Sequence, residues 1–363
     1  MEKMVKNQLS HTYKDRRVLV TGYTGFKGSW LTLWLKELGA SVIGIALSPE
    51  TSPNHWDLLN LNIEEHRIDI RDASILRKIV KECEPEIVFH FAAQALVRRS
   101  YLNPLETWST NVMGTANLLD ACRQCPSIKA IVVITTDKCY ENKEWIWGYR
   151  ENDRLGGHDP YSASKAGAEL VVASYRNSFF NYPGAPLLAS ARAGNVIGGG
   201  DWSEDRLIPD IVRSIENKEP LVIRSPQATR PWQHVLDCLS GYLLLGQKLL
   251  SNEKSFAESW NFGPGPEGNQ NVEKILNLMK NTWPAIQWQL DDKIQPHETL
   301  FLQLDSTKAQ QKLMWKPLWS FSVGVSETAN WYKTFIETGQ IISIWQIQNY
   351  MNHAKDAGMT WAL

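Results

Sequence analysis

Short apolar runs rich in β-branched residues alternate with longer segments of helical period through the first half of the chain. A strand needs only about five residues and an amphipathic helix about ten or more, so this alternation predicts consecutive β-α units around a parallel sheet. The predicted strands cover residues 17–21, 41–47, 66–70, 87–92, 130–136 and 187–193. The predicted helices cover residues 26–38, 74–83, 104–122 and 161–180. The pattern therefore indicates a doubly wound α/β domain.

The alternation loosens beyond residue 195, where a run of three glycines and several prolines mark loops and the periodic segments become shorter. We expect a smaller substrate-binding lobe there, whose pieces alternate with returns to the sheet at residues 233–250 and 260–263. The predicted division is a sheet domain and a lobe. The sheet domain comprises residues 1–193 with returns at about 233–263, and the lobe comprises residues 194–232 and 264–363.

Composition excludes several classes of protein. The chain has 363 residues and a formal net charge of −1, which gives no reason to expect a nucleic-acid partner. No apolar run is long enough to span a bilayer and the first residues lack a signal-peptide core, so we expect a cytoplasmic protein without membrane contact. Among five scattered cysteines, Cys122 and Cys125 form a CxxC without a second pair to complete a zinc site. We expect reduced thiols and no metal.

A glycine motif, T-G-Y-T-G-F-K-G, follows the first predicted strand and opens the first predicted helix. Its glycines are Gly22, Gly25 and Gly28. Glycine lets the backbone turn tightly and approach a pyrophosphate, which then rests on the helix N-terminus. A plain glycine turn is the alternative, but the order strand, glycines, helix favours dinucleotide binding.

The strand that begins near residue 130 ends in four polar residues, Thr135, Thr136, Asp137 and Lys138. It therefore brings hydroxyls, a carboxylate and an amine to one edge of the sheet. Downstream, Tyr161 and Lys165 are spaced so that both side chains lie on one face of a helix. The lysine ammonium can lower the pKa of the tyrosine and so make it a base. Together these residues predict a catalytic site at this edge.

The glycine spacing resembles the GxxGxxG motif of the extended short-chain dehydrogenase/reductase family, and D-I-R-D at 69–72 and F-A-A-Q at 91–94 are further matches. The resemblance implies a Rossmann-type sheet and NAD as cofactor, with Asp69 and Ile70 near the adenine. The cofactor residues that it implies are Gly22, Thr24, Gly25, Phe26, Lys27, Gly28, Ser48, Asp69, Ile70, Phe91, Ala92, Ala93, Gln94, Asn111, Thr135, Tyr161 and Lys165.

The second predicted strand departs from the expected pattern. An acidic residue near its end would bind the 2′-hydroxyl of NAD, but here the run is I-A-L-S, ending at Ser48. No arginine follows that could bind a 2′-phosphate. The preference for NAD over NADP therefore rests on the family resemblance alone.

The same resemblance implies catalytic roles. In this family a hydroxyl at the end of the fifth strand bonds the substrate alcohol that the tyrosine deprotonates. The resemblance therefore implies that Thr136 supplies this hydroxyl, that Tyr161 is the base and that Lys165 activates Tyr161. Asp137 and Lys138 are not needed by simple epimerases and reductases, but they resemble the acid and base of sugar-nucleotide 4,6-dehydratases.

Three segments resemble the members of that family that act on CDP-glucose: T-D-K-C-Y at 136–140, R-A-G-N-V-I-G-G-G-D-W at 192–202 and R-P-W-Q-H-V at 230–235. The implied reaction oxidises C4, eliminates water across C5 and C6, and returns the hydride to C6. Asp137 would serve as the acid, and Lys138 as the C5 base or the group that stabilises the enolate. The implied role is in making deoxysugar precursors of surface polysaccharides such as the lipopolysaccharide O-antigen.

Substrate contacts are suggested by residue chemistry, because the guanidinium group of arginine matches a diphosphate. The predicted substrate residues are Asn195, Trp202, Arg206, Arg230 and His297. Alternatively, each arginine is only an exposed surface charge, and Trp202 is only a core residue.

Two other functions stay open at this point. One is an NAD-dependent sugar-nucleotide epimerase or reductase, and the other is a non-catalytic dinucleotide sensor, which would usually lack the Tyr-Lys pair. We also expect a homodimer formed through the helices at 104–122 and 161–180, because both carry apolar residues on more than one face.

Overall fold

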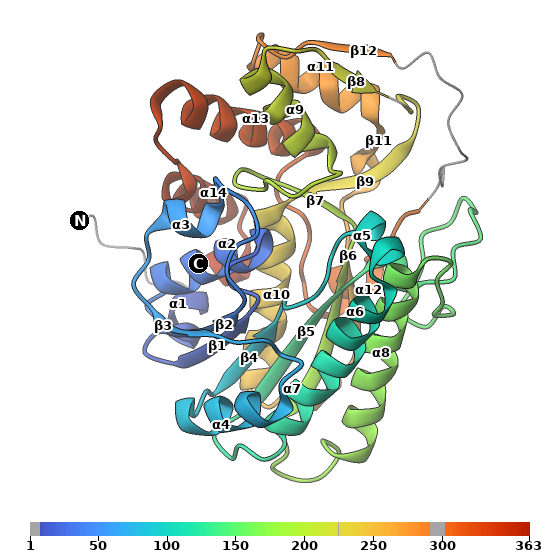
Figure 1. The fold of residues 1–363 in the computed structure, drawn as a ribbon. Coiled ribbons are helices and arrows are strands. Elements are labelled where there is room, and N and C mark those ends of the chain that lie inside the picture. Colours follow the sequence, from blue (N-terminus) through green and yellow to red (C-terminus); the bar gives the residue numbers. More distant parts are fainter. Residues whose placement is uncertain (1–7, 224, 291–301) are drawn as a thin grey trace.

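The computed structural model describes residues 8–223, 225–290 and 302–363, and its centre is a seven-stranded parallel sheet (Figure 1). The strand order is β10-β6-β5-β4-β1-β2-β3. The strands are β1 Arg17–Thr21, β2 Ser41–Ala46, β3 Glu64–Arg67, β4 Ile87–His90, β5 Ala130–Thr136, β6 Leu187–Ala193 and β10 Ser259–Phe262. The chain runs from β1 outwards to β2 and β3 and then crosses to β4 on the other side of β1, which is the switch of a doubly wound sheet.

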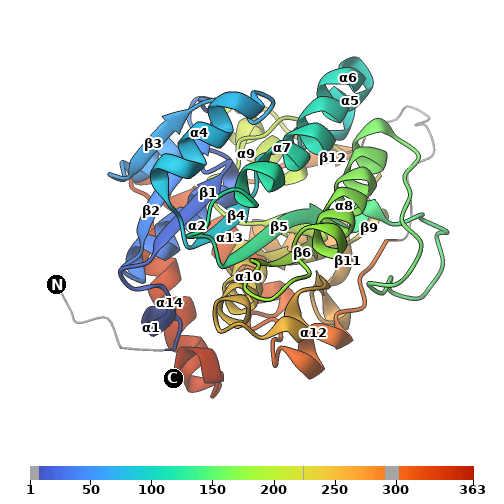
Figure 2. The same ribbon diagram turned by 90° about the horizontal axis from the view of Figure 1, so that it is seen from below.

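Helices cover both faces of this sheet (Figure 2). On one face lie α4 Ala73–Cys83, α7 Gly114–Cys122 and α8 Pro160–Ser178, and on the other lie α2 Phe26–Glu37 and α10 Val235–Leu250. Because water reaches neither face, the central strands are largely apolar, and every residue of β5 is buried, including Thr135 and Thr136 at its end. The predicted Rossmann-type α/β fold is confirmed.

Smaller sheets lie beyond the carboxyl ends of the strands. One joins β7 Asn195–Ile197, β9 Thr229–His234 and β11 Asn269–Asn271, and another pairs β8 Leu221–Ile223 with β12 Trp288–Leu290. The helices α9 Leu207–Asn217, α11 Val272–Thr282 and α13 Phe321–Thr338 pack in the same region (Figure 1).

The remaining elements are short helices and turns, together with α14. They are α1 Gln8–Tyr13, α3 His55–Leu59, α5 Val97–Leu102, α6 Pro104–Trp108, η1 Ser109–Met113, η2 Asp137–Cys139, η3 Lys254–Phe256, η4 Pro266–Gly268, α12 Thr307–Lys312, α14 Ser343–Asp356 and η5 Thr360–Ala362. Within the described ranges, no helix combines the length and the apolar character that crossing a bilayer requires.

Two predicted elements differ from the structure by more than two residues at an end or in their division. The third strand was predicted at residues 66–70 but lies at Glu64–Arg67, because it can pair only as far as β2 extends and its last partner is Ala46. The predicted helix at 104–122 is divided into α6, the π-helical turn η1 and α7. A π turn holds one more residue than an α turn, which the hydrophobic pattern does not reveal.

Candidate functional site

The glycine loop between β1 and α2 packs against the chain that leaves β4. Gly22 has φ +73°, and a Cβ there would lie 2.6 Å from the amide nitrogen of Ala92. A Cβ on Gly28 would lie 2.1 Å from the carbonyl oxygen of Gly22. Gly25 is the N-cap of α2, and no side chain caps the helix there. The loop thus presents bare backbone at a helix N-terminus, which fits a dinucleotide pyrophosphate.

Other predicted cofactor residues surround this loop. Thr24 donates a 3.0 Å hydrogen bond to the carbonyl oxygen of Leu47, which ties the loop to the end of β2, and Ser48 is exposed beside it. Phe26 and Lys27 form the first turn of α2. All of these residues follow directly on β1 or β2, so they lie at the carboxyl ends of these strands.

The chain after β4 is positioned by Asn111. Asn111 accepts a hydrogen bond from the Gln94 amide at 2.8 Å and donates to the Gln94 carbonyl and to Ser164 at 2.9 Å each. The Gln94 side chain in turn bonds Leu96 and Thr107. Phe91, Ala92 and Ala93 lie in the same segment. The Asn111 side chain therefore holds the predicted cofactor loop in place by bonding the backbone of Gln94.

The predicted adenine-side residues follow β3. The Asp69 carboxylate bonds the backbone amide and the guanidinium of Arg71, and these contacts lower the pKa of Asp69 below its ordinary value. The buried Ile70 side chain occupies the space beside Gly114, where a Cβ would lie 2.5 Å from its Cδ1.

The end of β5 carries the polar residues that the sequence singled out. Thr136 donates a 2.9 Å hydrogen bond to Asp137 Oδ1 and accepts one from the Lys138 amide at 3.3 Å, so it caps the turn η2. Asp137 is buried, and its Oδ2 has no hydrogen-bond partner among the described residues. A Cβ on Gly194 would lie 3.1 Å from that oxygen, so the glycine leaves space beside it. A buried carboxylate oxygen without a partner is available to a ligand.

Helix α8 brings the tyrosine and lysine to this point. Asp159 caps its N-terminus through the Ser162 amide, and proline at the first position fixes where the helix begins. Tyr161 and Lys165 then share a face, and Thr136 lies close enough to Tyr161 for its hydroxyl to lower the Tyr161 pKa. Lys138, in the turn η2, is by contrast half-buried.

The electrostatics of this cluster follow from burial. Desolvation raises the pKa of Tyr161 to about 12, against the opposing influence of Arg206 and the Thr136 hydrogen bond. Desolvation, together with the Lys27 cation, lowers the pKa of Lys165 to about 8. The lowering of the Tyr161 pKa by Lys165, expected from the sequence, stays a prediction.

Lys27, in the first turn of α2, is a further charged group of this region. Burial lowers its pKa, and the charges of Asp137 and Asp201 oppose that shift while Arg206 adds to it.

The sequence did not indicate Glu169, which lies on α8 on the same face as Tyr161 and Lys165. Glu169 follows Lys165 by one further turn of α8, and its carboxylate accepts hydrogen bonds from Thr135, Ser190 and Arg192. Thr135 was predicted to contact the cofactor, and in the structure its hydroxyl is bonded to Glu169 at 2.5 Å. The i, i+4, i+8 spacing of Tyr161, Lys165 and Glu169 was the available signal.

The predicted substrate residues lie in several settings. Arg206 is at the N-cap of α9 with its guanidinium 3.1 Å from the Asp201 carboxylate, and Asn195 opens β7. Arg230 lies on β9 and donates to the Thr229 carbonyl. Trp202 is buried among Trp331, Tyr332 and Phe335, the core position that the sequence left open. His297 lies outside the described residues.

A doubly wound sheet with a bare glycine loop at its switch point, and a tyrosine and a lysine one turn apart beside it, defines a short-chain dehydrogenase/reductase of the extended type. Residues 19–328 match the family described as GDP-mannose 4,6 dehydratase. The chain belongs to this family.

Individual relatives agree with that assignment. The chain is 51% identical over 349 residues to the CDP-glucose 4,6-dehydratase of Salmonella typhimurium, which covers 94% of this chain and 97% of the relative. The structure is similar to an epimerase of Methanothermobacter thermautotrophicus, with a TM-score of 0.79, 25% identity and coverage of 91% and 95% of the two chains. It is also similar to the dTDP-glucose 4,6-dehydratase of Streptomyces venezuelae solved with NAD, with a TM-score of 0.72, 25% identity and coverage of 87% and 97%.

Proposed function

We propose that this enzyme converts CDP-glucose to CDP-4-dehydro-6-deoxyglucose and water, with NAD as a cofactor that is regenerated in each turnover. The 51% identity to a CDP-glucose 4,6-dehydratase supports the substrate. The observation that carries dehydration is the position of Asp137, a buried carboxylate whose Oδ2 has no hydrogen-bond partner among the described residues, directly after Thr136 at the end of β5.

The oxidation step uses Tyr161 and Thr136. Tyr161 takes the proton of the sugar 4-hydroxyl while Thr136 bonds the same oxygen and holds it in line. Bound NAD would supply the hydride acceptor for C4 and the hydride donor for C6. The high pKa of the buried Tyr161 means that its phenolate is a strong base once formed, and Lys165, one turn further along α8, provides a positive charge beside it.

Elimination needs an acid at O6 and a base at C5. Asp137 protonates the departing hydroxyl, which leaves as water, and Lys138 removes the C5 proton or stabilises the enolate. A proton returned to C5 when C6 is reduced completes the balance, so no net oxidation occurs. Glu169 and Asn111 touch neither sugar nor cofactor in this scheme and act as positioning residues.

Cofactor choice can be measured directly. We expect isothermal titration to show tighter binding of NAD than of NADP. The reason is family membership, since Ser48 stands where an acidic residue would bind the 2′-hydroxyl. Tighter binding of NADP would contradict this part of the proposal.

Substrate choice and reaction type are tested together. We expect purified enzyme with CDP-glucose to form a 4-keto-6-deoxy product that absorbs in alkali, with a much larger kcat/KM than for dTDP-glucose. Equal specificity constants would contradict the choice of CDP-glucose. Formation of a 4-epimer without loss of water would show an epimerase instead, and binding of dinucleotide without turnover would show a sensor.

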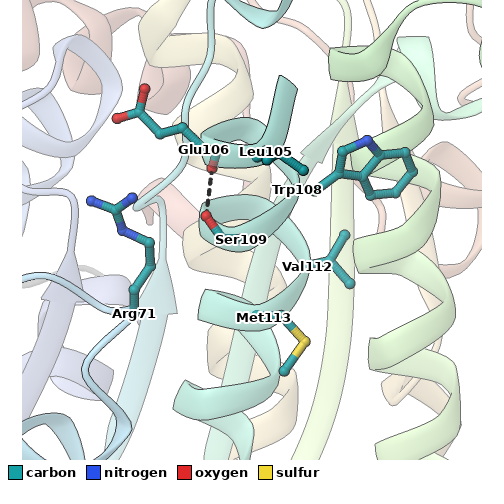
Figure 3. Close-up of a pocket in the computed structure, with 7 residues that line it drawn as sticks. All are labelled: Arg71, Leu105, Glu106, Trp108, Ser109, Val112 and Met113. Carbon is teal, nitrogen blue, oxygen red and sulfur yellow. Dashed lines mark hydrogen bonds between the residues drawn. The ribbon is translucent and has the colours of Figure 1, made fainter. Parts of the chain in front are cut away.

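We further propose a homodimer that pairs through α6, η1 and α8. Leu105, Trp108 and Met113 project from α6 and η1 around a shallow hollow of about 690 Å³ (Figure 3), and all three side chains are exposed. Leu170 on α8 is exposed too. An exposed apolar stripe across adjacent helices is complementary to a second copy of itself when two copies meet about a two-fold axis.

We propose that the large sheet and the smaller sheets belong to two domains that bind different molecules. Residues 1–193 with the returns α10 and β10 would bind NAD, and residues 194–232 and 264–363 would bind the sugar nucleotide. A cytoplasmic location is proposed as well, because the five cysteines are unpaired thiols, as is usual in a reducing compartment.

A further inference from the structure

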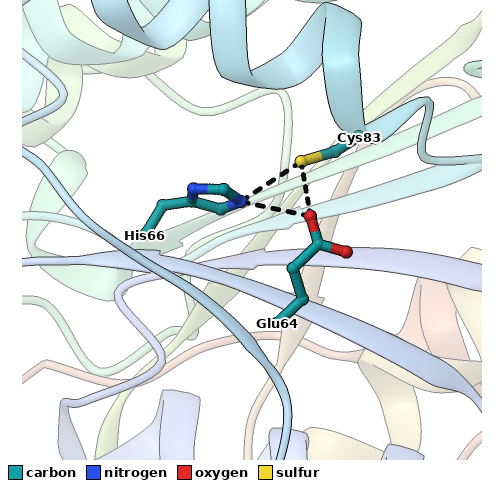
Figure 4. Close-up of side chains that lie close together, drawn as sticks. All are labelled: Glu64, His66 and Cys83. Atoms are coloured by element: carbon teal, nitrogen blue, oxygen red, sulfur yellow. Dashed lines mark hydrogen bonds and ion pairs between the residues drawn. The ribbon is translucent and has the colours of Figure 1, made fainter.

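Three potential metal ligands converge at the outer edge of the large sheet, on side chains that the proposed reaction does not use. Glu64 and His66 lie two residues apart on β3, so their side chains share one face of the strand, and Cys83 is the last residue of α4 (Figure 4). The Cys83 sulfur is 3.1 Å from Glu64 Oε1 and 3.4 Å from His66 Nε2, and these two atoms are 3.2 Å apart. The three atoms therefore form a nearly equilateral triangle.

The size of this triangle is close to that of one face of a zinc coordination tetrahedron. With Zn–S bonds of about 2.3 Å and Zn–N and Zn–O bonds of about 2.0–2.1 Å, tetrahedral ligands are about 3.3–3.6 Å apart. The observed separations of 3.1–3.4 Å would widen by only a few tenths of an ångström to admit the ion. The site is thus nearly formed before any ion binds.

The burial and the charges around the triangle fit a cation that the protein binds on one side and that faces solvent on the other. Cys83 is 2% exposed, whereas the Glu64 and His66 side chains are 45% and 28% exposed, so solvent can supply the fourth ligand. The last carbonyl of α4, that of Cys83, accepts a 2.7 Å hydrogen bond from the Arg17 guanidinium, so this cation is held by groups outside the triangle. Arg17 opposes binding by its charge, yet it contacts Glu64 through Oε2 at 3.4 Å and leaves Oε1 facing the triangle.

We propose that Glu64, His66 and Cys83 bind a thiophilic divalent cation of the zinc type, with water as the fourth ligand. The spacing 64, 66, 83 matches no common zinc motif, so the sequence alone does not indicate this site. The bound ion ties the edge strand β3 to α4 and so stabilises the fold. None of the three ligands belongs to the proposed catalytic residues.

Cobalt provides the direct test, because a thiolate bound to Co²⁺ gives an intense near-ultraviolet band and tetrahedral Co²⁺ absorbs in the visible. We expect metal-free protein to bind one equivalent of Co²⁺ with both signals and to lose them when Zn²⁺ is added. Cys83→Ser should abolish the near-ultraviolet band. His66→Gln and Glu64→Gln should each weaken binding by about tenfold or more.

Two control variants separate this site from its neighbours. Glu65→Gln removes a carboxylate from the same strand that bonds Tyr23, and Cys125→Ser removes a thiol of the CxxC, so both should keep the band. Zn²⁺ should raise the melting temperature of the wild type and leave that of Cys83→Ser unchanged, with circular dichroism confirming that the variants fold. Absence of one-equivalent binding, or a band that survives in Cys83→Ser and disappears in Cys125→Ser, would overturn the proposal.

Discussion

The carboxylate of Glu169 and the guanidinium of Arg192 form an ion pair at 2.7 Å, with both side chains almost fully buried beneath the Tyr161–Lys165 face of α8. Arg192 also donates to the Tyr140 hydroxyl, and Glu169 accepts from Thr135. Burial by itself would raise the pKa of Glu169, but Arg192 and the hydroxyl donors hold it below its ordinary value. The pair therefore fastens α8 to the ends of β5 and β6.

Replacing Glu169 by glutamine should destabilise the protein strongly. The change leaves the Arg192 charge buried without a counter-charge, which costs about 3–5 kcal/mol. Denaturant unfolding measures this loss. Glu86→Gln, which breaks the partly exposed ion pairs with Arg16 and Lys129, should cost about 2 kcal/mol or less. Equal losses in the two variants would show that the buried pair has no special importance.

Tyr161→Phe should lower kcat by about 10²–10⁴-fold, because it removes the base of the first step while keeping the ring. Mixing this variant with NAD and CDP-glucose should produce no transient NADH absorbance. Tyr175→Phe, on the same helix where the ring packs on Phe179, should keep nearly full activity. Turnover by Tyr161→Phe within a few-fold of wild type would require another base.

Stability should depend on pH through Lys165, whose pKa is lowered by burial from 10.5 to about 8. Below about pH 8 the lysine is protonated in the folded and the unfolded state, so it contributes no slope. Between about 8 and 10.5 only the unfolded chain holds the proton, and the free energy of unfolding rises with pH by up to about 1.4 kcal/mol per unit. Unfolding measured across this range should show the rise in wild type and in the surface variant Lys129→Met, but not in Lys165→Met.

Lys138→Ala should leave the first oxidation intact and stall the elimination. The variant with NAD and CDP-glucose should accumulate NADH absorbance on the enzyme, with little solvent deuterium entering C5. Lys143→Ala, which removes a surface ion pair with Glu141 in the same loop, should behave as wild type. Exchange at C5 at the wild-type rate in Lys138→Ala would exclude Lys138 from the elimination.

The double variant Leu105→Glu with Leu170→Glu should convert a dimer to a monomer, because four charges would be buried in the proposed interface. Light scattering at micromolar concentration distinguishes the two masses. Ile344→Glu changes an exposed apolar residue on α14 and should leave the dimer intact. A monomeric wild type would show that the stripe on α6 and α8 has another purpose.

The sequence predicted the central sheet well because the inner strands are buried on both faces and so contain apolar runs, such as the first five residues of β5. It failed at β3, whose residues E-E-H-R are polar because one side of an edge strand meets water. It also placed the glycine loop, the β5 end and the Tyr161–Lys165 pair, whose positions follow from local motifs.

What could not be predicted depends on contacts between distant segments. Glu169 reads as an ordinary helix residue until β6 brings Arg192 beside it, and Asn111 reads as a cofactor contact until its amide is seen to bond Gln94 and Ser164. The same holds for Lys27, whose neighbours Asp137 and Arg206 come from other parts of the chain.

The π turn η1 fixes the rotational phase between α6 and α7. Leu105 faces outwards before it, whereas Leu118 and Leu119 face the sheet after it. Regular α winding of residues 109–113 with no residue lost would rotate one half by about 100° against the other. Leu105 on one side and Leu118 and Leu119 on the other could then not all keep their present surroundings. Deleting one residue here removes the extra residue that the π turn accommodates, so a deletion should disturb the two halves less than an insertion of one residue.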